Sequence, residues 1–301
     1  MINETNFFEE QIVKQVKKFY PYMGSKARHL SLLNNIINRI NIDYSKFDYI
    51  EPFIGSGIVL LNLEKDFKSY WVNDWQREMI LPFLTCKKLT DDFILSTIKE
   101  VEKTYKIEVN KEDFYLFRDN VYNKEKDDNL KTVYSFMLFC TTINNMVRFG
   151  KNGYNTAFGN RLYSNKINNF IESINYCKTK DIKATNLCFT EMSKDFRDRK
   201  DIFLMLDPPY MNTDASYRND SNVVKVIINY LIEKKPYFIY TDLENEYNEK
   251  LKDYFDFEYI KVLRNISPNL YLSIEESLKL LIVLLNYYYL IAIQFLVLAK
   301  N

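Results

Sequence analysis

Residues 47–64, FDYIEPFIGSGIVLLNLE, decide the fold class. An apolar run ends at Ile50, a turn with Gly55 and Gly57 follows, and apolar residues resume at Ile58. Glycine alone takes positive φ without steric cost and lets another backbone or a ligand come close. The stretch therefore predicts a strand, a tight turn and a helix, the unit with which nucleotide-binding α/β sheets begin.

Further short apolar runs, each ending in polar or proline residues, recur along the chain. They cover residues 70–72, 202–206, 237–240 and 282–285, and helical spacing of apolar residues marks 30–40. Strands of this length that alternate with helices predict a mostly parallel α/β sheet, a Rossmann-like architecture. Ligands bind such sheets at the carboxyl ends of the strands.

Residues 86–170 break this alternation, because they are rich in charge and helical patterning and, later, in glycine. We therefore expect an α/β domain in two parts, 11–85 and 171–287, an inserted domain at 86–170 between them, and an apolar extension at 288–301. Residues 11–42 and 131–170 carry eleven basic side chains and no acidic one, although the whole chain has a net charge of only +1. Acid-free basic segments can bind a phosphate backbone locally, or they can be solvated surface.

Composition excludes several classes of site. The chain has one histidine, His29, and four cysteines with no C-x-x-C spacing, so we expect no metal site and no Ser-His-Asp triad. The first residues are acidic and lack an apolar run, so we expect no signal peptide and a cytoplasmic location.

The apolar stretch at 280–299 leaves two interpretations open. Its length would suit a membrane span, and its β-branched and aromatic residues suit buried strands equally well. Asn286 and Gln294 interrupt it, and three tyrosines lie at its middle instead of at an interface. We expect a core strand that ends near Asn286, followed by an apolar extension that is not a membrane anchor.

The glycine turn has a companion acid. Asp74 follows Gly55 by 19 residues, at the end of the next predicted strand, a spacing at which an acid commonly binds ribose hydroxyls. A dinucleotide fingerprint would need a third glycine where Leu60 stands. A nucleoside cofactor without a pyrophosphate, such as S-adenosylmethionine, fits better, and a purely structural turn is the alternative.

The tetrapeptide Asp207-Pro208-Pro209-Tyr210 follows a buried-type run at the expected carboxyl end of a strand. Two prolines fix φ and remove two N–H donors, so the Asp207 carboxylate and the Pro208 carbonyl can act together as acceptors for an exocyclic amine. Tyr210 offers a flat face on which a base can stack. The alternative is a rigid turn with a helix-capping aspartate.

Together these segments resemble the Dam-type DNA adenine-N6 methyltransferases, the D12 class found in bacteria and phages. The matching segments are PYMGSK at 21–26, EPFIGSGIVLLN at 51–62, VNDWQREMI at 72–80, NNMVRFGKNGYNTAFGNR at 144–161, LDPPY at 206–210 and LLIVLLNY at 280–287. They stand in the family's order, which implies that the two-part domain at 11–85 and 171–287 is catalytic and that the insert at 86–170 is a mostly helical target-recognition domain with a β-hairpin. Two departures are Thr241-Asp242 in place of Ser-Asn and Ala157 in place of a hairpin proline.

The resemblance implies a site-specific, adenine-specific DNA methyltransferase that moves a methyl group from S-adenosylmethionine to N6 of an adenine flipped out of duplex DNA, by default at GATC. It implies three groups of residues: for the cofactor, Tyr22, Lys26, Glu51, Pro52, Phe53, Gly55, Gly57, Asp74 and Asp207; for catalysis, Asp207, Pro208, Pro209 and Tyr210; for DNA, Asn144, Met146, Arg148, Asn155 and Arg161. Arginine forks match guanine O6 and N7, although Arg148 and Arg161 could instead contact phosphates.

Two rival functions stay open. One is a methyltransferase that acts on RNA or protein, and the other is a catalytically silent DNA-binding module. The partner is expected to be double-stranded DNA, with a cognate restriction endonuclease possible, a membrane role not expected, and the protein a monomer or weak dimer.

Overall fold

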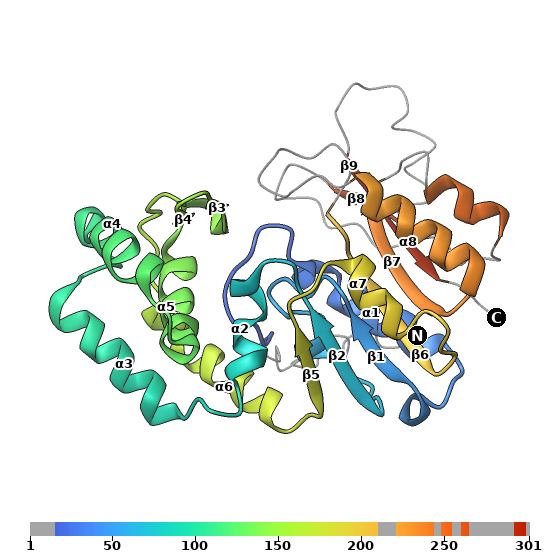
Figure 1. The fold of residues 1–301 in the computed structure, drawn as a ribbon, viewed down its shortest axis with the longest axis horizontal. Helices are drawn as coiled ribbons and strands as arrows, with labels where there is room; N and C mark the ends of the chain where they lie inside the picture. The colour runs from blue at the N-terminus through green and yellow to red at the C-terminus, as the bar shows by residue number, and fades with distance from the viewer. Residues whose placement is uncertain (1–15, 210–220, 244–247, 255–259, 265–291, 299–301) are drawn as a thin grey trace, which may run out of the picture. The chain divides into compact units, whose positions relative to one another are not determined.

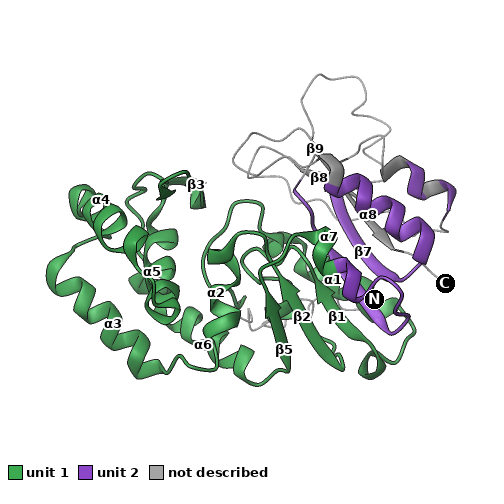
Figure 2. Ribbon diagram, viewed as in Figure 1, with its two compact units in different colours: residues 1–192 green, residues 193–301 purple. Residues whose placement is uncertain are grey.

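The computed structural model describes residues 16–209, 221–243, 248–254, 260–264 and 292–298. They form two compact units, residues 1–192 and 193–301 (Figures 1 and 2). Each unit combines helices with paired strands, and the strand pairs β1–β2, β2–β5 and β6–β7 are parallel. This confirms the predicted α/β class with a mostly parallel sheet.

In unit 1 three parallel strands lie side by side in the order β5-β2-β1 (Figure 1). They are β1 (Asp48–Glu51), β2 (Ser69–Asn73) and β5 (Ile182–Thr185). Glu51 pairs with Val72, and Asn73 pairs with Thr185, so the three carboxyl ends meet at one edge of the sheet. The predicted helix at 30–40 is α1 (Leu30–Arg39), which buries the apolar face that its spacing indicates.

The turn after β1 differs from the prediction, because the segment directly after Gly57 does not form an α-helix. The chain forms only the 3-10 turn η3 (Leu60–Asn62). The Asn62 amide donates to the carbonyl of Ile58 and exchanges two further hydrogen bonds with the backbone of Lys17. Side chain-to-backbone bonds of this kind compete with helix propagation, which explains the short turn.

Five helices account for most of the remainder of unit 1. They are α2 (Arg77–Thr85), α3 (Asp91–Thr104), α4 (Lys111–Asn120), α5 (Asp128–Thr141) and α6 (Ile167–Lys178), with the single turn α7 (Phe189–Met192) after them. The helices α3, α4 and α5 each begin at a polar residue, Thr90, Asn110 or Asp127, whose side chain accepts hydrogen bonds from the first turn. Such caps satisfy N–H groups that have no partner within the helix.

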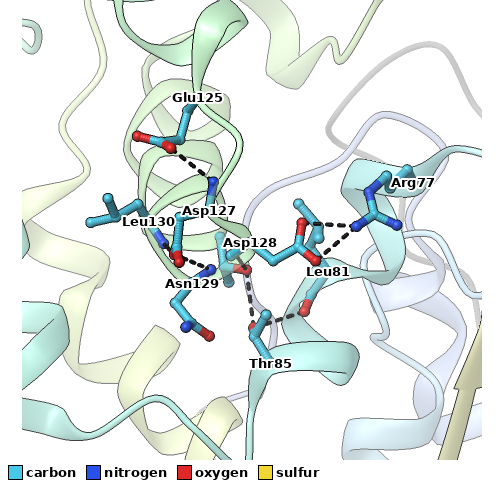
Figure 3. Close-up of polar contacts among 9 residues, drawn as sticks. Arg77, Leu81, Thr85, Glu125, Asp127, Asp128, Asn129 and Leu130 are labelled. Atoms are coloured by element: carbon cyan, nitrogen blue, oxygen red, sulfur yellow. Dashed lines mark hydrogen bonds and ion pairs between the residues drawn. The ribbon is translucent and has the colours of Figure 1, made fainter.

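Polar contacts join α2 to the start of α5 (Figure 3). Arg77 makes a bidentate ion pair with Asp128, with distances of 2.9 and 2.7 Å. The hydroxyl of Thr85, which is buried, donates to the carbonyl of Leu81 and lies 3.0 Å from the hydroxyl of Thr132. Asp127 accepts from the N–H groups of Asn129 and Leu130, so one short segment both caps α5 and ties it to α2.

The predicted hairpin is present after α5. The strands β3 (Phe149–Gly150) and β4 (Gly153–Tyr154) pair antiparallel. Beneath them, aromatic rings fill the core, with Phe139 meeting Phe149 and Tyr154 at centroid distances of 6.2 and 5.0 Å. The hairpin is therefore seated on α5, and the turn between α5 and β3 is held between two anchored elements.

Unit 2 contains the strands β6 (Ile202–Leu206), β7 (Tyr237–Leu243), β8 (Ile260–Arg264) and β9 (Ala292–Leu298), with α8 (Ser221–Lys234) between β6 and β7. Their order is β6-β7-β9-β8. β6 and β7 are parallel, whereas β9 runs antiparallel to both β7 and β8. All five residues of β6 are buried, as its continuous apolar run predicts.

The C-terminal segment departs from the expected organisation. The predicted last strand at 282–285 lies outside the described residues. Residues 292–298, expected to belong to an extension beyond the sheet, are the strand β9 between β7 and β8. Across the described part of the chain, no helix is long and apolar enough to cross a membrane.

Candidate active site

The glycine turn lies at the carboxyl end of β1, and its conformation requires glycine. Gly55 and Gly57 have φ of 52° and 72°, a region that other residues rarely adopt. A Cβ on Gly57 would come within 2.8 Å of Cζ of Phe83 and 3.2 Å of Phe19. A Cβ on Gly55 would meet only the ring of Tyr22, at 3.5 Å. Gly57 is thus fixed by packing, while Gly55 presents its backbone beside an aromatic ring.

Asp74 holds this turn in place. Its Oδ2 accepts a hydrogen bond from the Gly55 N–H at 2.9 Å, and its Oδ1 accepts one from the Gln76 N–H at 2.8 Å. Burial raises the pKa of Asp74 to about 6, although the two backbone donors act in the opposite direction. A carboxylate acceptor therefore lies next to the glycine turn, at the strand end where a ribose is expected.

Asn73 joins the strand ends beside Asp74, a structural role that the sequence pattern does not indicate. Its buried amide donates to the carbonyls of Pro52 and Leu187, both at 3.0 Å. Its Oδ1 accepts from the hydroxyl of Thr185 at 2.9 Å and from the N–H of Leu187 at 2.8 Å. One side chain thereby joins the segments that follow β1, β2 and β5. This role depends on the pairing of β2 with β5, which the apolar pattern of the sequence does not predict.

Three further predicted cofactor residues of unit 1 are Glu51, Lys26 and Phe53. Glu51 and Lys26 are charged side chains that are only 2% and 3% exposed. Glu51 accepts a hydrogen bond from the Tyr49 hydroxyl at 2.7 Å, and burial together with the Glu51 charge raises the pKa of Tyr49. The Lys26 ammonium donates to the carbonyl of Gly24, and Phe53 stacks on Phe189. Buried charged side chains need polar partners, which the protein or a ligand can supply.

The Asp-Pro-Pro segment follows β6 in unit 2. Asp207 is half-buried, and its Oδ1 accepts a hydrogen bond from the hydroxyl of Thr241 at 2.6 Å. Pro208 is buried and Pro209 half-buried. Tyr210 lies outside the described residues. The structure thus places the carboxylate at the end of a buried parallel strand, as predicted.

The predicted DNA-reading residues lie in and around the hairpin of unit 1. Arg148 is exposed, and its Nε donates to Oδ1 of Asn155 at 2.9 Å. The Arg148 backbone N–H donates to the hydroxyl of Thr156, which is buried. Asn155, predicted to contact DNA, therefore acts on Arg148 by holding one side of its guanidinium.

The turn before the hairpin is unusual. Asn144 and Asn145 both have positive φ, 53° and 54°, and Asn144 is exposed. Arg161 donates from Nη1 to Oδ1 of Asn145 at 2.6 Å, and the N–H of Met23 donates to the carbonyl of Asn145 at 3.1 Å. The predicted DNA segment is thus bonded to the loop of residues 21–26, which also contains Tyr22 and Lys26. Met146 is half-buried.

Within the described ranges, no cluster of three or more histidine, cysteine, aspartate or glutamate side chains is placed to hold a metal ion. Of the cysteines, Cys86, Cys140 and Cys177 are buried thiols and Cys188 is partly exposed. Burial raises the pKa of Cys140 to about 12, which leaves this thiol protonated and unreactive at neutral pH.

Comparison with known proteins decides the family. The family model described as D12 class N6 adenine-specific DNA methyltransferase matches residues 22–266. The chain belongs to this family. It is similar to the type II methyltransferase M.MjaIII of Methanocaldococcus jannaschii, with 30% identity over 215 residues that cover 67% of this chain and 73% of that one.

Two DNA adenine methylases are also similar to this adenine methyltransferase. That of Vibrio cholerae serotype O1 is 26% identical over 209 residues, 68% of this chain and 70% of its own. That of Haemophilus influenzae is 25% identical over 282 residues, 87% and 92% of the two chains. The protein is an adenine-specific DNA methyltransferase, its substrate is DNA, and its methyl donor is S-adenosyl-L-methionine.

Proposed function

We propose that the protein methylates N6 of an adenine flipped out of duplex DNA, with Asp207 and the Pro208 carbonyl as acceptors for the amine. The single observation that carries the role of Asp207 is its position directly after the buried strand β6, with its carboxylate held by a buried hydroxyl. Tyr210, outside the described residues, is proposed to stack on the base.

The methyl donor is proposed to bind in unit 1. Tyr22 and the turn from Glu51 to Gly57 would surround it, with Asp74 as the acceptor for ribose hydroxyls and the buried Lys26 beside the methionine carboxylate. The open backbone of Gly55, the Asp74 carboxylate and the two buried charges fit a ligand with a ribose and an amino-acid end. When bound, S-adenosylmethionine supplies a methyl group on a positively charged sulfur.

Asp207 would act by positioning and electrostatics. The lone pair of an adenine amine is delocalised into the ring, and acceptors that bind both N–H groups favour a pyramidal nitrogen whose lone pair is available for attack. The methylated ammonium product is strongly acidic, so no strong base is needed. Positioning and preorganised charge can supply most of such a rate enhancement.

Removing the Asp207 carboxylate tests this role. Asp207→Ala should lower the methylation rate by at least about 100- to 1,000-fold, while binding of S-adenosylmethionine and of DNA stays near wild type. The matched control is Asp201→Ala, which removes a carboxylate paired with Arg199 just before the same strand. Wild-type turnover by Asp207→Ala would refute the assignment, as would equal loss in the control.

For the recognition site, we propose GATC or a related short sequence read by Arg148 and Arg161 from the hairpin. The two arginines are exposed, and each is held by an asparagine side chain. Long-read sequencing of host DNA after expression, read for N6-methyladenine, tests the sequence. Modification in a context unrelated to GATC would overturn it.

The same host, challenged with phage, would show whether a cognate restriction endonuclease acts with this enzyme. Light scattering would test the proposed monomer or weak dimer.

A further inference from the structure

Thr241 and Asp207 meet because of the pairing between β6 and β7. These strands are parallel, and Leu206 pairs with Tyr240. The next residue on each strand, Asp207 and Thr241, therefore lies at the same level of the sheet. The Thr241 hydroxyl donates to Oδ1 of Asp207 at 2.6 Å.

Several features make this contact well defined. Thr241 is only 1% exposed, so water does not compete for its hydroxyl. A β-branched side chain in a strand has few accessible rotamers, and a hydroxyl has a single proton to donate. A hydrogen bond from a neutral donor to a carboxylate is also shorter and stronger than one between two neutral groups. The orientation of the Asp207 carboxylate is thus coupled to a rigid, buried residue.

The neighbouring residues of β7 form a separate pair, which supplies a matched control. The Tyr240 hydroxyl donates to Oδ2 of Asp242, also at 2.6 Å, and both side chains are fully buried. Successive side chains of a strand point to opposite faces of the sheet. Both contacts join a hydroxyl of β7 to a carboxylate, so their chemistry is the same. Only the contact of Thr241 involves Asp207.

We propose that Thr241 is a positioning residue for methyl transfer, whose hydroxyl holds the Asp207 carboxylate in the orientation that receives the adenine amine. The inference rests on the proposed role of Asp207. It assigns a function to a position at which the chain departs from the Ser-Asn of the family it resembles, and it requires only that residue 241 supply a hydroxyl.

Two substitutions separate the hydroxyl from the packing of the side chain. Thr241→Val keeps the volume and the branching and removes the donor, whereas Thr241→Ser keeps the donor and removes a methyl group. We expect Thr241→Val to lower kcat about 10- to 100-fold, because a misplaced catalytic group commonly costs about that much. KM for DNA and for S-adenosylmethionine should stay within about twofold, and Thr241→Ser should recover most of kcat. A purely structural role would give the opposite order, with serine the worse variant.

Tyr240→Phe is the control, since it removes the neighbouring hydroxyl without touching Asp207. Its kcat should remain within about threefold of wild type, even where its melting temperature falls. Wild-type kcat in Thr241→Val, or equal losses in Thr241→Val and Tyr240→Phe, would overturn the inference. If Asp207→Ala is itself active, the proposed function fails; if Asp207→Ala is inactive and Thr241→Val is normal, only the role of Thr241 fails.

Discussion

Replacing Gly57 by alanine should destabilise the protein strongly, for two reasons that the structure separates. The φ of 72° costs a non-glycine residue about 1–2 kcal/mol. The new Cβ would also lie 2.8 Å from Phe83 and 3.2 Å from Phe19, and forcing extra atoms into a packed core costs about 1–3 kcal/mol. The free energy of unfolding should therefore fall by about 2–5 kcal/mol, a large share of the roughly 5–15 kcal/mol typical of a native protein.

Gly24→Ala is the matched control. Gly24 has a φ of 85°, yet a Cβ there would meet nothing within 4 Å. This variant should show the backbone cost alone, about 1–2 kcal/mol. Urea unfolding of both variants, followed by circular dichroism, gives the comparison. If Gly57→Ala is no less stable than Gly24→Ala, the close packing of the turn against Phe83 and Phe19 does not contribute, and the reasoning is refuted.

Three further predictions follow from the site and its supports. The pKa of Asp74 is about 6, and an ionised carboxylate is a stronger acceptor for a ribose hydroxyl than the protonated acid. Affinity for S-adenosylmethionine should therefore rise by up to about tenfold from pH 5 to pH 7, as measured by calorimetry. Asp74→Asn should show no such rise, and a wild-type affinity independent of pH would contradict the ribose role. Arg148→Ala should cost about 1–3 kcal/mol of discrimination at one base pair if its fork reads a guanine. If DNA affinity instead falls equally for all sequences, and the slope of log affinity against log salt concentration falls by about one, Arg148 contacts a phosphate. Asp127→Ala, which removes the cap of α5, should lower the free energy of unfolding by about 1 kcal/mol. Arg77→Ala breaks only an exposed ion pair and should cost less than that in the same unfolding assay; the reverse order would contradict the capping argument.

The parts of the fold that sequence predicts are those with a strong local pattern. β6 coincides with its apolar run, and α1 with its helical spacing, because burial on one or both faces dictates residue type at each position. β5, with the sequence IKAT, was not foreseen. It is the outer strand of its group and only partly buried, so hydrophobicity does not mark it.

The same distinction holds for the site: residues marked by a local sequence pattern can be predicted, and residues defined by long-range contacts cannot. The positions of Asp74 and Asp207 are predictable, since an acid within two residues of the end of an apolar run marks the carboxyl end of a strand. Asn73, Asn155 and Thr241 act through hydrogen bonds to residues up to 114 positions away, and such partners become known only when the strands have been paired. The predicted helix after Gly57 is wrong, and the Asn62 side chain donates to the Ile58 carbonyl, which a helix would have paired with the Asn62 backbone N–H.

The place of β9 in the sheet has a consequence for the nascent chain. β7 receives β6 on one side, and its other neighbour lies about 50 residues further along the sequence. At a synthesis rate of about 5–20 residues per second, β7 waits roughly 3–10 s with its second edge unpaired. An open strand edge is a template for pairing with other chains, so translation speed and temperature should govern how much of this enzyme is recovered folded.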